Sequence, residues 1–262
     1  RVASILNNLG LLNYQMGNFH SSRDFYEKAI AIKTRLYGPD HIDVAWTLNG
    51  LANLAEETGD FIQARSLYER ALSIREKALG PQHLHVAWGH NNLGHLLHLM
   101  GDYAGAESQL EMALSIEQET VGEEAGDTAM TLLNMAHLKS TTGDFRRSRE
   151  LLSQTLKIRE KILSLDDPVL ANTLYEIAAL NAERGELAEA ETYFRRALAI
   201  WNKTLAGDPS SPQASSNQRD YSRSLNGLAA VLTDQNKLVE ARSLYERALE
   251  IREKAFRPDH PI

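Results

Sequence analysis

Asparagine recurs inside the expected helices of this chain at a spacing close to 42 residues. The column comprises Asn7, Asn8, Asn49, Asn91, Asn92, Asn134 and Asn226. Asparagine is a poor helix former, so its repeated use inside helices needs a reason. Its carboxamide carries both a hydrogen-bond donor and an acceptor, which suits the backbone of an extended peptide. Two interpretations stay open: the amides bind a peptide, or they bond neighbouring helices and fix their stacking.

Aromatic residues and histidines flank this column. Trp46 and Trp88 occupy equivalent positions one repeat apart, and Tyr14 could join them. Tryptophan supplies the large, rigid contact area of a binding hot spot, but it would equally fill a seam between adjacent repeats. His95 and His137 continue the column one helical turn further along. We interpret these side chains as the sources of specificity in a binding groove.

Four histidines raise the question of a metal site: His90, His95, His98 and His137. Imidazoles three residues apart share a helix face and can coordinate zinc, but no carboxylate completes a recognisable ligand motif. The chain has no cysteine, which excludes disulfides and thiolate ligands. We therefore expect the histidines to line a polar surface, and we expect no metal and no cofactor.

The sequence lacks the motifs of an enzyme. It has no glycine-rich phosphate loop after a strand, no His-Glu-x-x-His and no strand to present a nucleophile. Arg-Glu-Lys triplets recur at 75–77, 159–161 and 252–254, near the expected ends of helices, where they indicate a solvated convex face. We therefore expect no catalytic residue and no enzymatic activity.

The elements that must position these residues follow from five glycines at an unbroken spacing of 42. They are Gly17, Gly59, Gly101, Gly143 and Gly185, and a sixth copy of the motif begins at Asn236 after 51 residues. On both sides of Gly59, apolar residues recur with the period of an amphipathic helix, so the glycine joins two helices by a tight turn. Self-similarity of this period predicts an all-α array of stacked helix pairs.

The repeat resembles the tetratricopeptide repeat (TPR), and its 42-residue length resembles the repeats of kinesin light chains. The residues that carry the resemblance in the second copy are Leu51, Ala52, Gly59, Asp60, Ala64, Tyr68 and Ala71. The resemblance implies an α-solenoid of six antiparallel helix pairs in a right-handed superhelix with a concave groove. It also implies that asparagines of the first helix in each pair bond the backbone of a bound peptide. The candidates carried over by position are Asn8, Asn49, Asn53, Asn91, Asn92 and Asn134.

The period divides the chain into six expected repeats. Their approximate bounds are 1–41, 42–83, 84–125, 126–167, 168–218 and 219–262. The fifth contains an insertion at 207–216, rich in Gly, Pro and Ser, which we expect to be a mobile surface loop. His41, His83 and His260 belong to the repeated linker and are expected to bond loop backbone. Because the chain starts inside a helical pattern and ends in a linker, we expect a fragment of a longer array.

Charge and hydropathy limit the classes of partner. The chain has 28 Lys and Arg against 35 Asp and Glu, a formal net charge of −7, and no basic block. We therefore expect neither nucleic acid nor a membrane as a partner. The sequence shows no signal peptide and no apolar run near the length that spans a bilayer, so we expect a cytoplasmic location.

Together these features favour a protein-interaction scaffold that holds a peptide or protein segment in a concave groove. Glu56, Glu57 and Glu183 are expected on or near the inner face, and they favour a segment that carries Lys or Arg. One alternative is a structural spacer or oligomerisation module. Another is the regulatory arm of a larger signalling or effector enzyme whose catalytic domain lies outside this chain.

Overall fold

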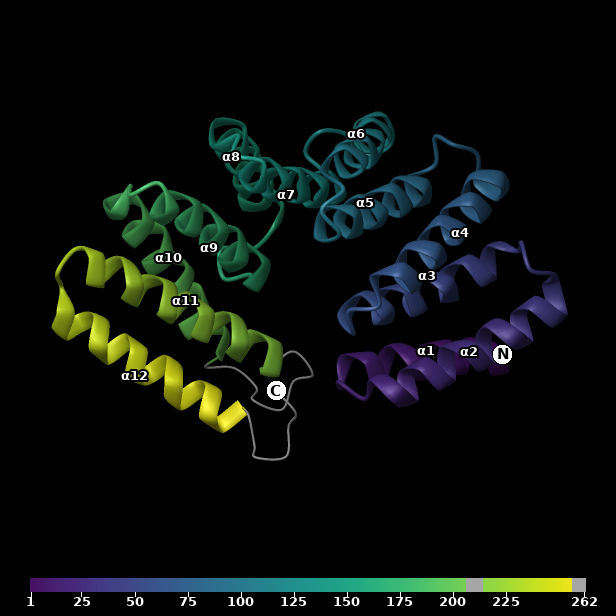
Figure 1. Cartoon of the computed structure of the whole chain (residues 1–262), viewed down its shortest axis with the longest axis horizontal. Helices are drawn as coiled ribbons and strands as arrows, with labels where there is room; N and C mark the ends of the chain where they lie inside the picture. The colour runs from purple at the N-terminus through teal and green to yellow at the C-terminus, as the bar shows by residue number, and fades with distance from the viewer. Residues whose placement is uncertain (206–213, 256–262) are drawn as a thin grey trace. The chain divides into compact units, whose positions relative to one another are not determined.

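The computed structural model describes residues 1–205 and 214–255, and all regular structure in those ranges is helical. Twelve α-helices follow one another in the described residues, joined by short turns and linkers (Figure 1). They are α1 (Val2–Gln15), α2 (Phe19–Tyr37), α3 (Ile42–Glu57), α4 (Phe61–Leu79), α5 (Leu84–Leu99), α6 (Tyr103–Thr120), α7 (Gly126–Thr141), α8 (Phe145–Ile162), α9 (Pro168–Glu183), α10 (Leu187–Leu205), α11 (Ala214–Asp234) and α12 (Leu238–Ala255). The predicted all-α fold of six helix pairs is confirmed.

Part of the chain's expected organisation falls outside the described residues. Most of the predicted insertion at 207–216 and the linker residue His260 lie there. However, α11 begins at Ala214, so the last three residues assigned to the insertion form the first turn of a helix. In the part of the chain that the structure describes, no helix is both long enough and apolar enough to cross a membrane.

Each helix pair turns at the glycine that sets the repeat. Gly59 adopts a φ of 79° between α3 and α4, a left-handed conformation that strains residues with a side chain. Asp60 then caps α4, because its side chain accepts a hydrogen bond from the backbone N–H of Gln63 at 3.1 Å. In the sixth pair Asn236 takes the glycine position with a φ of 61°. Asparagine is one of the few side-chain-bearing residues that adopt this conformation readily.

Histidine closes two of the linkers between pairs. His41 and His83 directly precede α3 and α5. The Nδ1 atom of each accepts a hydrogen bond from the backbone N–H two residues later, at 3.2 and 3.1 Å respectively. Each ring thereby satisfies one of the backbone donors that a helix start leaves without a partner. The predicted structural role of these two histidines is confirmed.

The helices group into two compact units. Residues up to Thr142 carry α1–α7, and the described residues from Gly143 onward carry α8–α12. Within the first unit the two helices of each complete pair pack together, and α2, α4 and α6 also pack on the first helix of the next pair. Within the second unit the same scheme joins α8 to α9, α9 to α10, α10 to α11 and α11 to α12. Every candidate residue for binding lies in the first unit.

Small residues hold the helices of the first unit close together. Ala52 and Ala64, two of the small residues of the repeat motif, are fully buried. A Cβ atom built on Gly10 would lie 2.7 Å from the ring of Tyr26, and one built on Gly50 would lie 2.8 Å from the same ring. The tyrosine of α2 therefore fills the space that two glycines leave on α1 and α3. Because the interior is densely packed here, a larger residue at either glycine would force the surrounding side chains or backbone into strained positions.

Candidate binding surface and pocket of the first unit

The asparagine column forms hydrogen bonds between neighbouring first helices. The Nδ2 atom of Asn92 on α5 donates to Oδ1 of Asn49 on α3 at 3.1 Å. In the next step along the unit, Nδ2 of Asn134 on α7 donates to Oδ1 of Asn91 at 2.9 Å. These two bonds tie α3 to α5 and α5 to α7, so the amides do contribute to stacking. Whether they also bind a peptide depends on the hydrogen-bonding groups that stacking leaves over.

Stacking uses only part of each amide. Among the described residues, Nδ2 of Asn91 and Oδ1 of Asn92 have no hydrogen-bond partner, which leaves one donor and one acceptor on adjacent residues of α5. Asn8 is exposed on α1 and makes no side-chain hydrogen bond within the described ranges. Asn53 differs, because its Oδ1 accepts from the hydroxyl of Tyr68 at 2.6 Å and from Asn49 at 3.3 Å. The Oδ1 atom of Asn53 is therefore engaged within its own repeat.

The histidines are held by separate partners. The Nδ1 atom of His95 lies 3.0 Å from Oε1 of Glu56, and Nε2 of His98 lies 2.9 Å from the hydroxyl of Thr141. Burial lowers the pKa of His98, and His95 and His137 lower it further through their charges. In the described ranges no group of three or more His, Asp or Glu side chains is placed to hold a metal ion.

The two tryptophans belong to a cluster that spans the α3–α5 seam. Their ring centroids are 6.4 Å apart, and His85 lies beside both, 4.7 Å from Trp46 and 4.6 Å from Trp88. The guanidinium of Arg75 lies 4.7 Å from the centroid of the Trp46 ring. Burial lowers the pKa of His85, and the charges of nearby His83 and Arg75 add to that effect. Sequence reasoning placed the tryptophans but missed His85 between them.

Tyr14 lies apart from the tryptophans. It packs against the buried cluster of Tyr26, Leu51 and Leu54, with its ring centroid 6.3 Å from that of Phe19. Burial raises the pKa of its hydroxyl, and the charges of the nearby glutamates at 56 and 57 act in the same direction. The structure thus places Tyr14 at the margin of the core rather than beside the Trp46 and Trp88 rings.

A register of buried charged residues runs through the second helices at the same 42-residue spacing. Their exposed fractions are 7% for Lys33, 2% for Arg75, 1% for Glu117 and 4% for Arg159. The sequence interpretation of the Arg-Glu-Lys triplets as a solvated face is therefore wrong for Arg75 and Arg159. The long arginine side chains reach inward between helices, while the residues that follow them in the triplets stay partly or fully exposed.

In the first unit this register connects to the asparagine column through threonine. Lys33 Nζ donates to the hydroxyl of Thr47 at 2.8 Å, and that hydroxyl donates to Oδ1 of Asn7 at 2.9 Å. Two repeats later, the hydroxyl of Thr131 lies 3.0 Å from Oε1 of Glu117 and 3.1 Å from Oδ1 of Asn91. A hydroxyl has one hydrogen, so Thr131 cannot donate to both acceptors at once.

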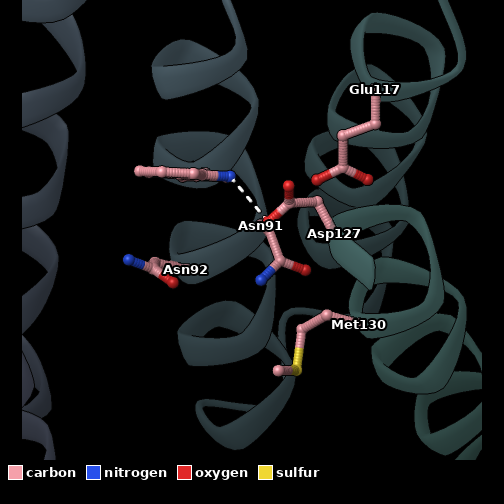
Figure 2. Close-up of a pocket in the computed structure, with 6 residues that line it drawn as sticks. Asn91, Asn92, Glu117, Asp127 and Met130 are labelled. Atoms are coloured by element: carbon pink, nitrogen blue, oxygen red, sulfur yellow. Dashed lines mark hydrogen bonds between the residues drawn. The ribbon is translucent and has the colours of Figure 1, made fainter. Parts of the chain in front are cut away.

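The charge reversal at Glu117 coincides with a pocket of about 250 Å³. Its lining comprises Trp88, Asn91 and Asn92 of α5, Glu117 of α6, and Asp127 and Met130 of α7. Figure 2 shows the carboxyl groups of Glu117 and Asp127 turned toward the same space as the amide of Asn91. The indole Nε1 of Trp88 donates to Oδ1 of Asp127 at 3.0 Å, which fixes the position of that carboxylate.

The electrostatics of this pocket are set by two carboxyl groups. The pKa of Glu117 is raised to about 7, mainly by burial; the hydrogen bond with Thr131 lowers it and the nearby charge of Asp127 raises it. Oε2 of Glu117 is buried and has no hydrogen-bond partner in the described part of the chain. Of the lining residues, the sequence predicted the three on α5 and missed the other three. The signal that could have found Glu117 is its acidic character at a position where four of the other five repeats carry Lys or Arg.

Comparison with known sequences identifies the repeat. One profile of the tetratricopeptide repeat matches residues 1–77, 49–119 and 127–203, and a second matches residues 222–262. A comparison with curated protein sequences gives no match. The family matches are to repeat sequences and cover well over half of the chain.

Several solved structures share the fold. BtubC (BKLC) from P. vanneervenii is 22% identical with a TM-score of 0.70, covering 96% of this chain and 95% of that one. A kinesin light chain-type protein from P. anserina with nearly identical TPR-like repeats is 23% identical with a TM-score of 0.63, covering 83% and 99%. A Rap protein complexed with competence and sporulation factor is 16% identical with a TM-score of 0.64, covering 94% and 73%. With both sequence profiles and fold in agreement, the chain belongs to the tetratricopeptide repeat family.

Proposed function

We propose that this chain is a protein-interaction scaffold that binds a peptide or protein segment on the first-helix surface of its first unit. The observation that carries the proposal is the pair of unused groups on α5, the Nδ2 donor of Asn91 and the Oδ1 acceptor of Asn92. Both residues line the pocket beside Trp88. A donor and an acceptor on adjacent residues match the alternating C=O and N–H groups of a peptide backbone.

The comparisons support the same class of function. One structure of similar fold is a Rap protein complexed with competence and sporulation factor, so a helical array of this type can hold a partner. The profiles that match this chain are those of a repeat, and none of them describes an enzyme. Solenoid repeats commonly bind partners along an extended surface. In this chain we assign that role to the pocket beside Trp88 and to the asparagine amides that line it.

A comparison of two alanine variants tests the proposal and separates contact from stacking. Peptides are selected from a random library displayed on phage against the whole chain, and their affinities are measured by calorimetry. Asn92→Ala removes both the interhelix bond and the unused acceptor. Asn49→Ala removes the same interhelix bond from its other end, together with the bond that Asn49 donates to Asn53, and leaves the acceptor of Asn92 in place. We expect at least a tenfold loss of affinity for Asn92→Ala and a much smaller loss for Asn49→Ala.

Two results would count against the proposal. If both variants weaken binding equally, the asparagines act through stacking and do not contact the peptide. If the library yields no peptide that binds the chain, while light scattering shows a molecular mass that rises with protein concentration, the structural or oligomerisation role is supported instead. Asn226→Ala serves as the matched control, since Asn226 is exposed on a first helix of the second unit.

A further inference from the structure

We propose that the pocket between α5 and α7 accepts a Lys or Arg side chain of the bound partner, with Glu117 and Asp127 as its counter-ions. This inference rests on the proposed function, and it specifies the chemistry of the partner at one subsite.

The source of hydrogen-bond donors changes along the buried register. In the first repeat a cation is the first donor in a series of hydrogen bonds: Lys33 donates to Thr47, which donates to Asn7. In the third repeat Glu117 stands where four of the other five repeats have Lys or Arg, and an ionised carboxylate has no hydrogen to donate. The repeat therefore lacks the positive charge that its equivalents supply, and the space next to this carboxylate is an open pocket.

One carboxylate oxygen of the pocket is buried and unsatisfied. Glu117 is only 1% exposed, and its Oε2 has no hydrogen-bond partner among the described residues. Asp127, the second carboxylate of the pocket, receives one bond from the Trp88 indole. None of the ion pairs in the described ranges joins a Lys or Arg to either carboxylate. A buried carboxylate oxygen without a partner is costly, so a cationic group that enters the pocket would gain a strong, charge-assisted hydrogen bond.

The size and lining of the pocket match a long cationic side chain. At about 250 Å³ it is smaller than the cavities that hold drug-sized ligands, and it suits a single long side chain. Trp88 and Met130 provide apolar surface for the methylene groups of a lysine or arginine. The amides of Asn91 and Asn92 line the same pocket and can bond the backbone of the same segment. Figure 2 shows the apolar side chain of Met130 at one side of the pocket and the carboxyl groups of Glu117 and Asp127 at the other.

A small-molecule titration tests the subsite without any selected peptide. The reporter is the indole N–H signal of Trp88 in ¹H–¹⁵N NMR, because this N–H donates to Asp127. The probes are N-acetyl-lysine methylamide and arginine amide, each compared with an uncharged analogue, N-acetyl-norleucine methylamide and citrulline amide. We expect a saturable shift of this signal with the two cationic probes and no saturable shift with the neutral ones. The indole signal of the fully buried Trp201 in the second unit serves as an internal control.

Three variants make the result specific to the pocket. Glu117→Gln keeps the shape and removes the charge, and Asp127→Asn keeps an oxygen for the Trp88 bond. We expect each to weaken the cationic probes at least fivefold. Glu111→Gln, on an exposed site of the same helix, should leave binding unchanged. Equal binding of charged and neutral probes, or unchanged binding by Glu117→Gln, would overturn the assignment.

The outcomes for the subsite and for the scaffold are separable. If selected peptides bind Glu117→Gln as tightly as the parent chain but lose affinity with Asn92→Ala, the scaffold function stands and the cation subsite is wrong. If the lysine probe titrates the Trp88 signal but no peptide is selected, the subsite stands and the peptide-binding proposal fails.

Discussion

The ionisation of Glu117 should make the free energy of unfolding depend on pH, and the substitution Glu117→Gln should remove this dependence. Its carboxyl group has a pKa of about 7 in the folded chain, against an ordinary value of 4.5, mainly because the group is buried. The folded state therefore holds the proton more tightly than the unfolded state does. Glu117 contributes its full stability below pH 4.5, and that contribution is lost as the pH rises through 7.

The size of the effect follows from that interval. Between 4.5 and about 7, each pH unit corresponds to about 1.4 kcal/mol, so ionisation of the folded chain costs roughly 3 kcal/mol in total. Glu117→Gln is neutral at every pH, and its amide can still bond the hydroxyl of Thr131. We expect the variant to match the parent near pH 4.5 and to be more stable by roughly 3 kcal/mol above pH 7.

Urea unfolding followed by circular dichroism measures this difference at an acidic and a mildly alkaline pH. The quantity of interest is the change in free energy of unfolding between variant and parent, because other groups that titrate in this range affect both proteins equally. A difference that is the same at both pH values would refute the reasoning that burial controls Glu117. The expected gain in stability also means that weaker binding of cations by this variant cannot be attributed to unfolding.

Two further predictions concern the backbone. Gly50→Ala places a Cβ atom 2.8 Å from the ring of Tyr26, so we expect a loss of about 1–3 kcal/mol in the free energy of unfolding, measured by urea titration. An unchanged midpoint would mean that the ring moves aside without cost. Asn236→Gly relieves the left-handed backbone at the last hairpin turn, and we expect a gain of roughly 0.5 kcal/mol. A lower melting temperature would show instead that the entropy of glycine outweighs the strain.

The fold was predictable because its determinants are local. A glycine followed by a capping residue ends one helix and starts the next, and the pattern recurs visibly along the chain, so twelve helices could be placed without any knowledge of tertiary contacts. The same period placed the asparagines and tryptophans on equivalent faces. For that reason Trp88, Asn91 and Asn92, predicted separately, meet in one pocket.

The rest of the pocket was not predictable from the same pattern, because it depends on which way long side chains turn. The arginines at 75 and 159 sit beside Glu and Lys in charged triplets, so their sequence suggests a solvated surface, yet both are buried. Glu117 occupies their register and reaches the pocket from a second helix. Asp127 and Met130 join it only because α7 packs on α5, which is a contact between repeats.

The single hydrogen of Thr131 has a consequence beyond the pocket. When Glu117 is protonated it can donate to Thr131, which leaves the threonine hydrogen for Asn91, the residue that also receives the bond from Asn134. When Glu117 is ionised, the threonine hydrogen turns to the carboxylate and Asn91 loses a donor. The charge state of Glu117 thus determines, through the orientation of the Thr131 hydroxyl, whether Asn91 receives a hydrogen bond from Thr131 at the contact between α5 and α7. A cation bound at the proposed subsite would favour the ionised carboxylate, and therefore the arrangement in which Asn91 has lost the threonine donor.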